Sequence, residues 1–230
     1  MLKSSKQFKR VSALLALLTF ISLSPTPINA APTTALPSQP ELLTMERTFH
    51  RLKIPTGKVD GLIDGQTRRA LCVWRELSGQ AFHRGLPTLD DLYEISKTEI
   101  LFPTTDMNLG LNVNLKCQSA VWIQENINEP VKVFKVSSGR ATFETIPGSF
   151  RIGWLIDDWY ESRRYPEGWM YRPQFFNAGQ AIHGSLEDSM VHSYPASHGC
   201  LRMVRKDIDF LWSVGYGRGS AITIYEKWVG

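Results

Sequence analysis

The hydrophobic period of the chain changes once, near residues 101–108, and this change limits the folds open to it. Before the change, apolar residues at 42, 45, 49 and 52 recur at the spacing of one buried helical face. After it, apolar residues follow a period of two in segments rich in β-branched and aromatic side chains. The sequence therefore predicts an α+β protein, with a small helical part before a mainly β part.

Capping and turn residues predict three short helices in the first part, over residues 41–100. The first ends at Pro55, and the second begins after the N-cap residue Asp64 and stops at Gly79. The third begins after Thr88, which is also a good N-cap. We expect these helices to form a small three-helix bundle.

The second part, residues 108–227, is expected to form a sandwich-like mixed sheet with one or two helices. Residues 126–130 fit a hairpin turn, and residues 205–214 have a helical pattern. Six segments are expected to be strands, namely 109–113, 120–124, 131–137, 150–155, 181–183 and 221–225.

Residues 1–30 have the order of a secretory signal peptide: basic, then apolar, then small residues, with no acidic residue. The apolar run is about 13 residues long, which is short of the roughly 20 that a membrane-spanning helix needs. We expect cleavage near Ala30, a flexible linker over residues 31–40 and no stable membrane insertion afterwards. We therefore expect the protein to be exported and to work outside the cytoplasm.

The net charge of +4 comes from this leader, which holds four of the 26 basic residues and none of the 22 acidic ones. The mature chain is thus formally neutral, which argues against a nucleic-acid partner. With 43% apolar and 21% charged residues, the composition is that of a folded protein and excludes wholesale disorder.

Two short segments place a thiol and two imidazoles near one another in the sequence. Residues 197–202 read Ser-His-Gly-Cys-Leu-Arg, and residues 182–184 read Ile-His-Gly. A cysteine attacks as its thiolate, and a neighbouring imidazole can take its proton, so both histidines are candidate bases. The glycine before Cys200 permits a sharp turn whose backbone N–H groups can face an oxyanion.

Two other interpretations of these residues exist. Cys200 could be a small buried apolar residue, or a zinc ion could be held by His183, His192, His198 and Cys200. The spacings match no paired-ligand zinc signature, so we expect no metal and no cofactor.

The two segments resemble the catalytic motif of the L,D-transpeptidase family. A His-Gly pair is followed, with 16 residues between His183 and Cys200, by Ser-His-Gly-Cys, an apolar residue and Arg. Residues 145–150, Thr-Ile-Pro-Gly-Ser-Phe, are similar to the turn Thr-x-Pro-Gly-x-Phe or Tyr of that family. The resemblance implies that Cys200 is the nucleophile and His183 the base, oriented by the carbonyl of Gly184. It also implies an oxyanion hole from the backbone of Gly199 and Cys200.

Four further residues are assigned to substrate binding. By the resemblance, His198 shapes the pocket, although the residues alone do not choose between His183 and His198 as the base. Arg202 braces the loop or meets a substrate carboxylate, and Ser197 helps to hold the loop. Tyr194 is placed with them.

The resemblance implies that the thiol cleaves the terminal D-Ala from a peptidoglycan tetrapeptide stem through a thioester. Transfer to an amine then cross-links the cell wall. Water as the acceptor would make the protein a carboxypeptidase-type hydrolase, and a third alternative is a non-catalytic wall-binding protein. Stem peptides and glycan are the expected partners of a monomeric protein.

Residues 59–70 resemble the loop and helix start of peptidoglycan-binding-like modules, at Asp60, Gly61, Thr67 and Ala70, with Trp74 following. The departure is Asp64, where the family usually has glycine. Binding of glycan and simple spacing of the enzyme both remain open for this module.

An exported chain can hold disulfides, and this chain has three cysteines. If Cys200 is the nucleophile, Cys72 with Cys117 is the only compatible pair, but the sequence leaves open whether they meet. The aromatic- and arginine-rich stretch at 154–179 is either a lid or substrate wall, or an insertion that packs on itself.

Overall fold

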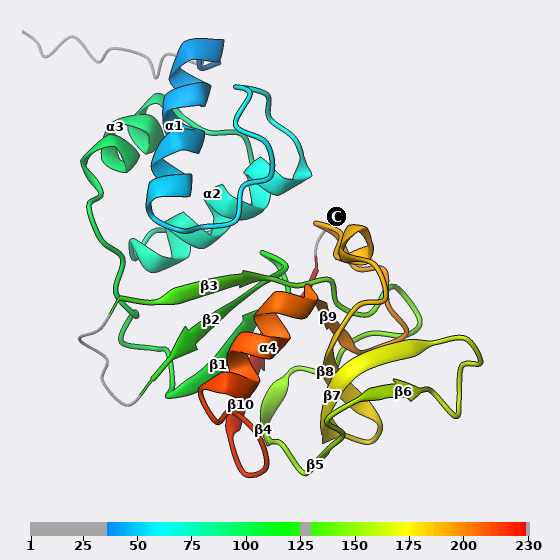
Figure 1. Ribbon diagram of the computed structural model, residues 1–230. Helices are drawn as coiled ribbons and strands as arrows, with labels where there is room; N and C mark the ends of the chain where they lie inside the picture. The colour runs from blue at the N-terminus through cyan, green and yellow to red at the C-terminus, as the bar shows by residue number, and fades with distance from the viewer. Residues whose placement is uncertain (1–35, 125–129, 229–230) are drawn as a thin grey trace, which may run out of the picture. The chain divides into compact units, whose positions relative to one another are not determined.

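The computed structural model describes residues 36–124 and 130–228 (Figure 1). The expected leader and most of the expected turn at 126–130 lie outside these residues. In the described part, three α-helices precede the first strand, and these are α1 (Gln39–Arg51), α2 (Gly65–Leu77) and α3 (Leu89–Lys97). A fourth, α4 (Arg205–Ser213), confirms the helix expected near the C-terminal end. None of the helices described has the length and apolar character needed to cross a membrane.

The helix starts follow from their caps, as the sequence predicts. Asp64 Oδ1 accepts hydrogen bonds from the backbone N–H groups of Gln66 and Thr67, at 2.7 and 2.8 Å. Thr88 Oγ1 accepts a hydrogen bond from Asp91 N at 3.1 Å, and α3 begins at the next residue. These side chains satisfy N–H groups that the first helical turn leaves without partners.

Helix α2 is buried on almost every side. Its buried residues include the charged Arg69, Arg75 and Glu76 as well as Trp74. One apolar core contains side chains of α1, α2 and α3 together with Val121, Ile123 and Val133 of the strands that follow. The three helices therefore share a core with the sheet, and a bundle that stands by itself remains a prediction.

The strands form two sheets of five in the described residues. The first sheet has the order β3-β2-β1-β10-β4, and the second has β5-β7-β8-β9 with β6 paired to β7. Each contains one parallel pair, β1 with β10 and β8 with β9. The first sheet consists of β1 (Gly110–Asn114), β2 (Ser119–Ile123), β3 (Lys132–Lys135), β4 (Gly148–Arg151) and β10 (Ala221–Tyr225). The second consists of β5 (Trp154–Leu155), β6 (Trp159–Glu161), β7 (Trp169–Asn177), β8 (Gln180–Gly184) and β9 (Leu201–Met203).

Three of these strands, β6, β7 and β9, were not expected from the sequence. Strand β7 lacks a clean alternation of apolar and polar residues, because its pairing with β8 shifts register twice. The expected strand at 150–155 is also two strands in different sheets, with a break at Ile152 and Gly153. The aromatic stretch is thus part of the second sheet, in which β7 is the longest strand.

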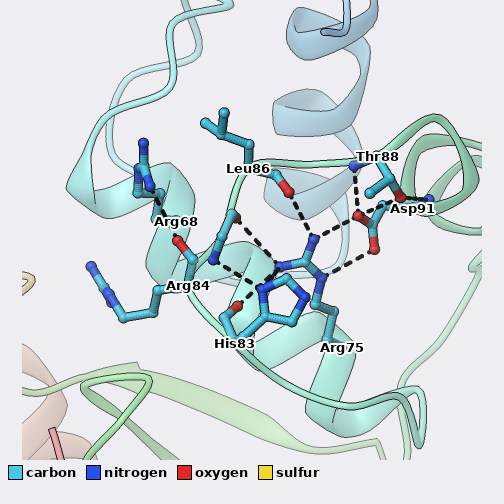
Figure 2. Close-up of polar contacts among 8 residues, drawn as sticks. Arg68, Arg75, His83, Arg84, Leu86, Thr88 and Asp91 are labelled. Carbon is cyan, nitrogen blue, oxygen red and sulfur yellow. Dashed lines mark hydrogen bonds and ion pairs between the residues drawn. The ribbon is translucent and has the colours of Figure 1, made fainter. Parts of the chain in front are cut away.

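A buried ion pair organises the connection between α2 and α3. Arg75 Nη2 lies 2.6 Å from Asp91 Oδ2, and both side chains are almost fully buried. The same guanidinium donates to the backbone carbonyls of His83 and Leu86, each at 3.0 Å (Figure 2). Every hydrogen-bond partner of the Arg75 guanidinium lies within residues 83–91, so this cluster is internal to the helical part.

A disulfide joins Cys72 of α2 to Cys117, in the turn between β1 and β2. Both residues are fully buried, and they are 45 positions apart in the sequence. The structure thus settles the pairing that the sequence left open, with Cys200 as the free cysteine.

We expect the Cys72→Ala/Cys117→Ala double variant to lose about 4 kcal/mol of unfolding free energy, because the disulfide restricts the unfolded chain over a long loop. Urea unfolding followed by tryptophan fluorescence measures the difference. The wild-type protein after reduction serves as the control and should fall by a similar amount. An unchanged unfolding free energy in both would contradict a stabilising disulfide.

Candidate active site

The candidate site lies where strands β8 and β9 run in parallel, and Figure 1 shows the two strands as neighbours. Their register places His183 opposite Arg202. Side chains of directly paired residues in a sheet project from the same face, and alternate residues of a strand share a face. Cys200 directly precedes β9, and its side chain packs against the cluster that contains Ala181, two residues before His183 in β8. The thiol therefore lies on the face of the sheet that carries the imidazole.

Cys200 is half-buried against the aromatic second sheet. Its neighbours in that small apolar cluster are Met170, Phe175, Ala181 and Tyr160. Burial raises the pKa of the Cys200 thiol above its ordinary value, and the nearby Arg202 cation acts in the opposite direction. In the resting protein at neutral pH the sulfur is therefore a thiol, not a thiolate.

His183 is buried, with 5% of its surface exposed, and has a fixed tautomer. Its Nδ1 lies 2.9 Å from the backbone oxygen of Gly184. A carbonyl only accepts hydrogen bonds, so Nδ1 carries the proton and Nε2 has the free lone pair. Burial lowers the pKa of His183 to about 4, which keeps the imidazole neutral and able to accept a proton near neutral pH.

The turn into the cysteine is held by the hydroxyl of Ser197. Ser197 Oγ accepts a hydrogen bond from Gly199 N at 3.0 Å and donates one to Cys200 O at 2.6 Å. Gly199 has a φ of +109°, a conformation that L side chains rarely adopt. Because the Gly199 N–H is already donated to Ser197, the expected pair of oxyanion donors is not free in this structure. The N–H of Cys200 has no acceptor among the described residues.

Two residues that sequence reasoning did not assign also hold this turn. Thr145 Oγ1 accepts from Gly139 N at 3.0 Å and donates to Gly199 O at 2.9 Å. The side chain of Gln180 forms hydrogen bonds with the backbone on both sides of Thr145: it donates to Glu144 O and accepts from Ile146 N. Thr145 opens the Thr-Ile-Pro-Gly-Ser-Phe turn, so its motif pointed to it, whereas nothing in the sequence distinguished Gln180.

The side chain of His198 points into an aromatic cluster. Its ring stacks on Tyr165 at 4.4 Å between centroids and meets the edge of Phe143 at 5.1 Å. Arg140 lies over the other ring of this cluster, 4.8 Å from the centroid of Phe143. Tyr165 lies between β6 and β7, so the aromatic stretch reaches the turn beside Cys200.

The remaining predicted site residues hold or flank the loop. Arg202 exchanges two backbone hydrogen bonds with Ser137, each at 3.0 Å, and its guanidinium donates to Ala196 O. Tyr194 is 51% exposed and stacks on His192. Within residues 36–124 and 130–228, no three His, Cys, Asp or Glu side chains gather as a metal site would require.

Because the pKa of His183 is low in the folded protein, we expect the unfolding free energy to fall at acidic pH. An unfolded histidine binds a proton near pH 6.5, whereas folded His183 does so only near pH 4. The stabilisation from the neutral imidazole is complete above pH 6.5 and is lost as the pH falls to 4. It is worth about 3 kcal/mol of unfolding free energy. We expect His183→Gln to lose about 3 kcal/mol less than wild type between pH 7 and pH 4, measured by urea unfolding. Equal losses of unfolding free energy in wild type and His183→Gln would contradict this prediction.

Residues 110–216 match the family model described as the L,D-transpeptidase catalytic domain. The fold is similar to the crystal structure of an L,D-transpeptidase from Xylanimonas cellulosilytica, with 25% identity, a TM-score of 0.55 and coverage of 85% of this chain and 100% of that one. It is also similar to an L,D-transpeptidase from Stackebrandtia nassauensis, at 20% identity and a TM-score of 0.51, covering 87% and 100% of the two chains. No curated protein sequence matches significantly.

Proposed function

We propose that this protein, whose residues 110–216 belong to the L,D-transpeptidase catalytic domain family, is a cysteine-dependent acyltransferase of the bacterial cell wall. Its substrate is a peptidoglycan tetrapeptide stem, from which it removes the terminal D-Ala. The observation that supports this proposal is that the free cysteine directly precedes β9, which pairs with the strand that carries the neutral, tautomer-fixed His183. That pair has what nucleophilic acyl transfer needs, a thiol and a base that can accept its proton.

In the first half-reaction, the sulfur of Cys200 attacks the carbonyl of the bond between an L-centre and a D-centre. His183 Nε2 takes the thiol proton and then gives it to the leaving amine of D-Ala, so that a thioester remains. The hydrogen bond from Nδ1 to Gly184 holds the ring in the orientation that this transfer requires. In the second half-reaction an amine of another stem attacks the thioester, and the thiol is restored.

We assign oxyanion stabilisation to the N–H of Cys200, because the Gly199 N–H is donated to Ser197. The role of Gly199 is then conformational: its positive φ lets the chain turn so that the next N–H faces the substrate. Ser197 and Thr145 preserve that turn through the hydrogen bonds described above.

Substrate recognition draws on the cations and aromatic rings beside the sulfur. The Arg202 cation partly opposes the rise in the pKa of Cys200 that burial causes, and Arg140 lies near both Arg202 and His198. A stem carboxylate entering here therefore meets two positive charges. Tyr194 and the aromatic ring stacked on His198 offer apolar surfaces for the peptide.

The remaining parts of the proposal concern location and domain organisation. Residues 1–30 export the protein, residues 31–40 link the leader to the mature part, and the enzyme acts in the periplasm or cell wall. Residues 41–100 form the peptidoglycan-binding-like module and residues 108–227 the catalytic domain. The enzyme works as a monomer.

We expect the mature protein to convert disaccharide tetrapeptides to cross-linked dimers with release of D-Ala, because an amine can resolve the thioester. Mass spectrometry of the products measures this. Cys200→Ser and His183→Gln should each lower the rate by at least about a hundredfold, since each removes one partner of the proton transfer. Products that carry only added water would instead identify a hydrolase. Binding to cell wall without any reaction would identify the protein as a non-catalytic wall-binding protein.

We also expect carbapenem β-lactams to acylate Cys200, since their strained amide presents an activated carbonyl to the thiol. Intact-protein mass spectrometry should show one adduct on the wild-type protein and none on Cys200→Ser. An adduct on the variant, or no adduct on a wild-type protein whose Cys200 reacts with iodoacetamide, would contradict this prediction.

A further inference from the structure

We propose that helix α2 holds the catalytic loop in place and that Arg69 is a positioning residue for Cys200. The catalytic loop is defined here as residues 185–199, between strand β8 and the cysteine. Its connection to α2 was not expected, because the helical part was assigned to binding glycan or to spacing. The consequence for turnover rests on the proposed function, whereas the consequence for the reactivity of Cys200 does not.

Arg69 connects the helix directly to this loop. Its side chain is 1% exposed, and no carboxylate of the described residues lies within ion-pairing distance of it. Instead Nη2 donates to the backbone oxygens of His192 and Val136. Nη1 donates to Gln66 Oε1 at 2.9 Å, whereas Nε has no hydrogen-bond partner among the described residues. A buried guanidinium without a carboxylate partner is costly, so these carbonyls and the Gln66 side chain hold it in position.

The two carbonyl oxygens that accept from Arg69 belong to two different backbone segments, the catalytic loop and the segment that begins at Val136. His192 lies in the catalytic loop, eight positions before Cys200. Val136 directly precedes Ser137, whose main chain pairs with Arg202 and whose hydroxyl donates to Tyr194 O at 2.8 Å. One guanidinium thus holds the loop and the segment on which the loop rests at a fixed spacing.

A second, independent route runs from the same helix through the disulfide. Cys117, bonded to Cys72 of α2, is followed by the fully buried Gln118. The side chain of Gln118 makes two hydrogen bonds of 2.8 Å with Ser138, one to its N–H and one to its hydroxyl. The backbone oxygen of Ser138 in turn accepts from Ala196 N and Ser197 N, at 2.9 and 3.0 Å.

Direct packing of the helix on the loop is equally close. Gly65 is the first residue of α2, and a methyl group added there would lie 2.2 Å from Ser193 Oγ. A larger side chain at this position would require the Ser193 side chain to move. The start of the helix and Arg69 therefore contact the catalytic loop directly, and Cys72 is connected to it through Cys117, Gln118 and Ser138.

Catalysis requires the sulfur to be placed within a fraction of an ångström, and a displacement of about 1 Å can cost on the order of a hundredfold in rate. A loop with no regular structure beyond one short 3-10 turn depends on contacts from outside for such precision. We therefore expect Arg69→Met, which removes the donors, to lower kcat by on the order of tenfold to a hundredfold with little change in KM.

The matched control is the double variant Arg75→Met/Asp91→Asn. Arg75 is an equally buried arginine of the same helix, but all its partners lie within residues 83–91 (Figure 2). The control variant should have a lower unfolding free energy than wild type, with no change in the arrangement of residues around Cys200. Thermal melts of both proteins set an assay temperature at which each remains folded.

Two measurements then test the proposal. The first is the rate of iodoacetamide alkylation of Cys200 from pH 5 to pH 10, followed by intact-protein mass spectrometry. The second is transfer of tetrapeptides. Arg69→Met should change the alkylation profile and kcat, the control should match wild type, and Arg69→Lys should recover part of the activity because it keeps a cationic donor. The Cys72→Ala/Cys117→Ala variant should resemble Arg69→Met.

Equal alkylation profiles and equal kcat for Arg69→Met and the control, per folded protein, would overturn the proposal. If Arg69→Met does not fold, the Arg69→Lys and disulfide variants decide by the same comparison. A wild-type protein that transfers nothing while the alkylation profiles still differ would refute the proposed function and support the role of Arg69.

Discussion

The parallel pairing of β8 with β9 is the constraint on which the site depends. It places His183 opposite Arg202 and brings the cysteine before β9 to the same face. Parallel strands cannot be joined by a tight turn, so a long connection must lead from one to the other. Here that connection is the catalytic loop, and contacts with the rest of the protein hold it in one conformation. Ser137, Ser138, Thr145 and Arg69 all do so through hydrogen bonds to its backbone or to that of its neighbours.

The electrostatics of the site favour a neutral resting pair. Burial raises the pKa of the thiol and lowers that of the imidazole, so neither group is charged until a reaction begins. A permanently ionised thiolate would be open to oxidation. In the proposed mechanism the proton moves only when a substrate carbonyl is present to accept the sulfur, and Arg202 favours the charge that then develops.

Local features of the chain predicted the helices and most of the first sheet. Asp64 and Thr88 are N-caps whose chemistry is contained within a few residues, and β-forming segments such as 110–114 carry their own pattern. The second sheet was largely missed, because β7 contains register shifts and β9 is only three residues long. The motif pointed to Cys200 and His183, but the contacts of Gln180 and Arg69 join residues far apart in the sequence. No local pattern encodes such contacts.

The shared core of the helices and the first sheet bears on how this protein can be divided. Val121, Ile123 and Val133 are covered by side chains of the helical part, and a disulfide crosses the same boundary. A fragment that begins at residue 100 would present these residues to water and would leave Cys117 without its partner. Cutting the chain at the boundary drawn by sequence resemblance would therefore divide one apolar core and break one disulfide. Exchange of the helical part between relatives would need matching changes on β2 and β3.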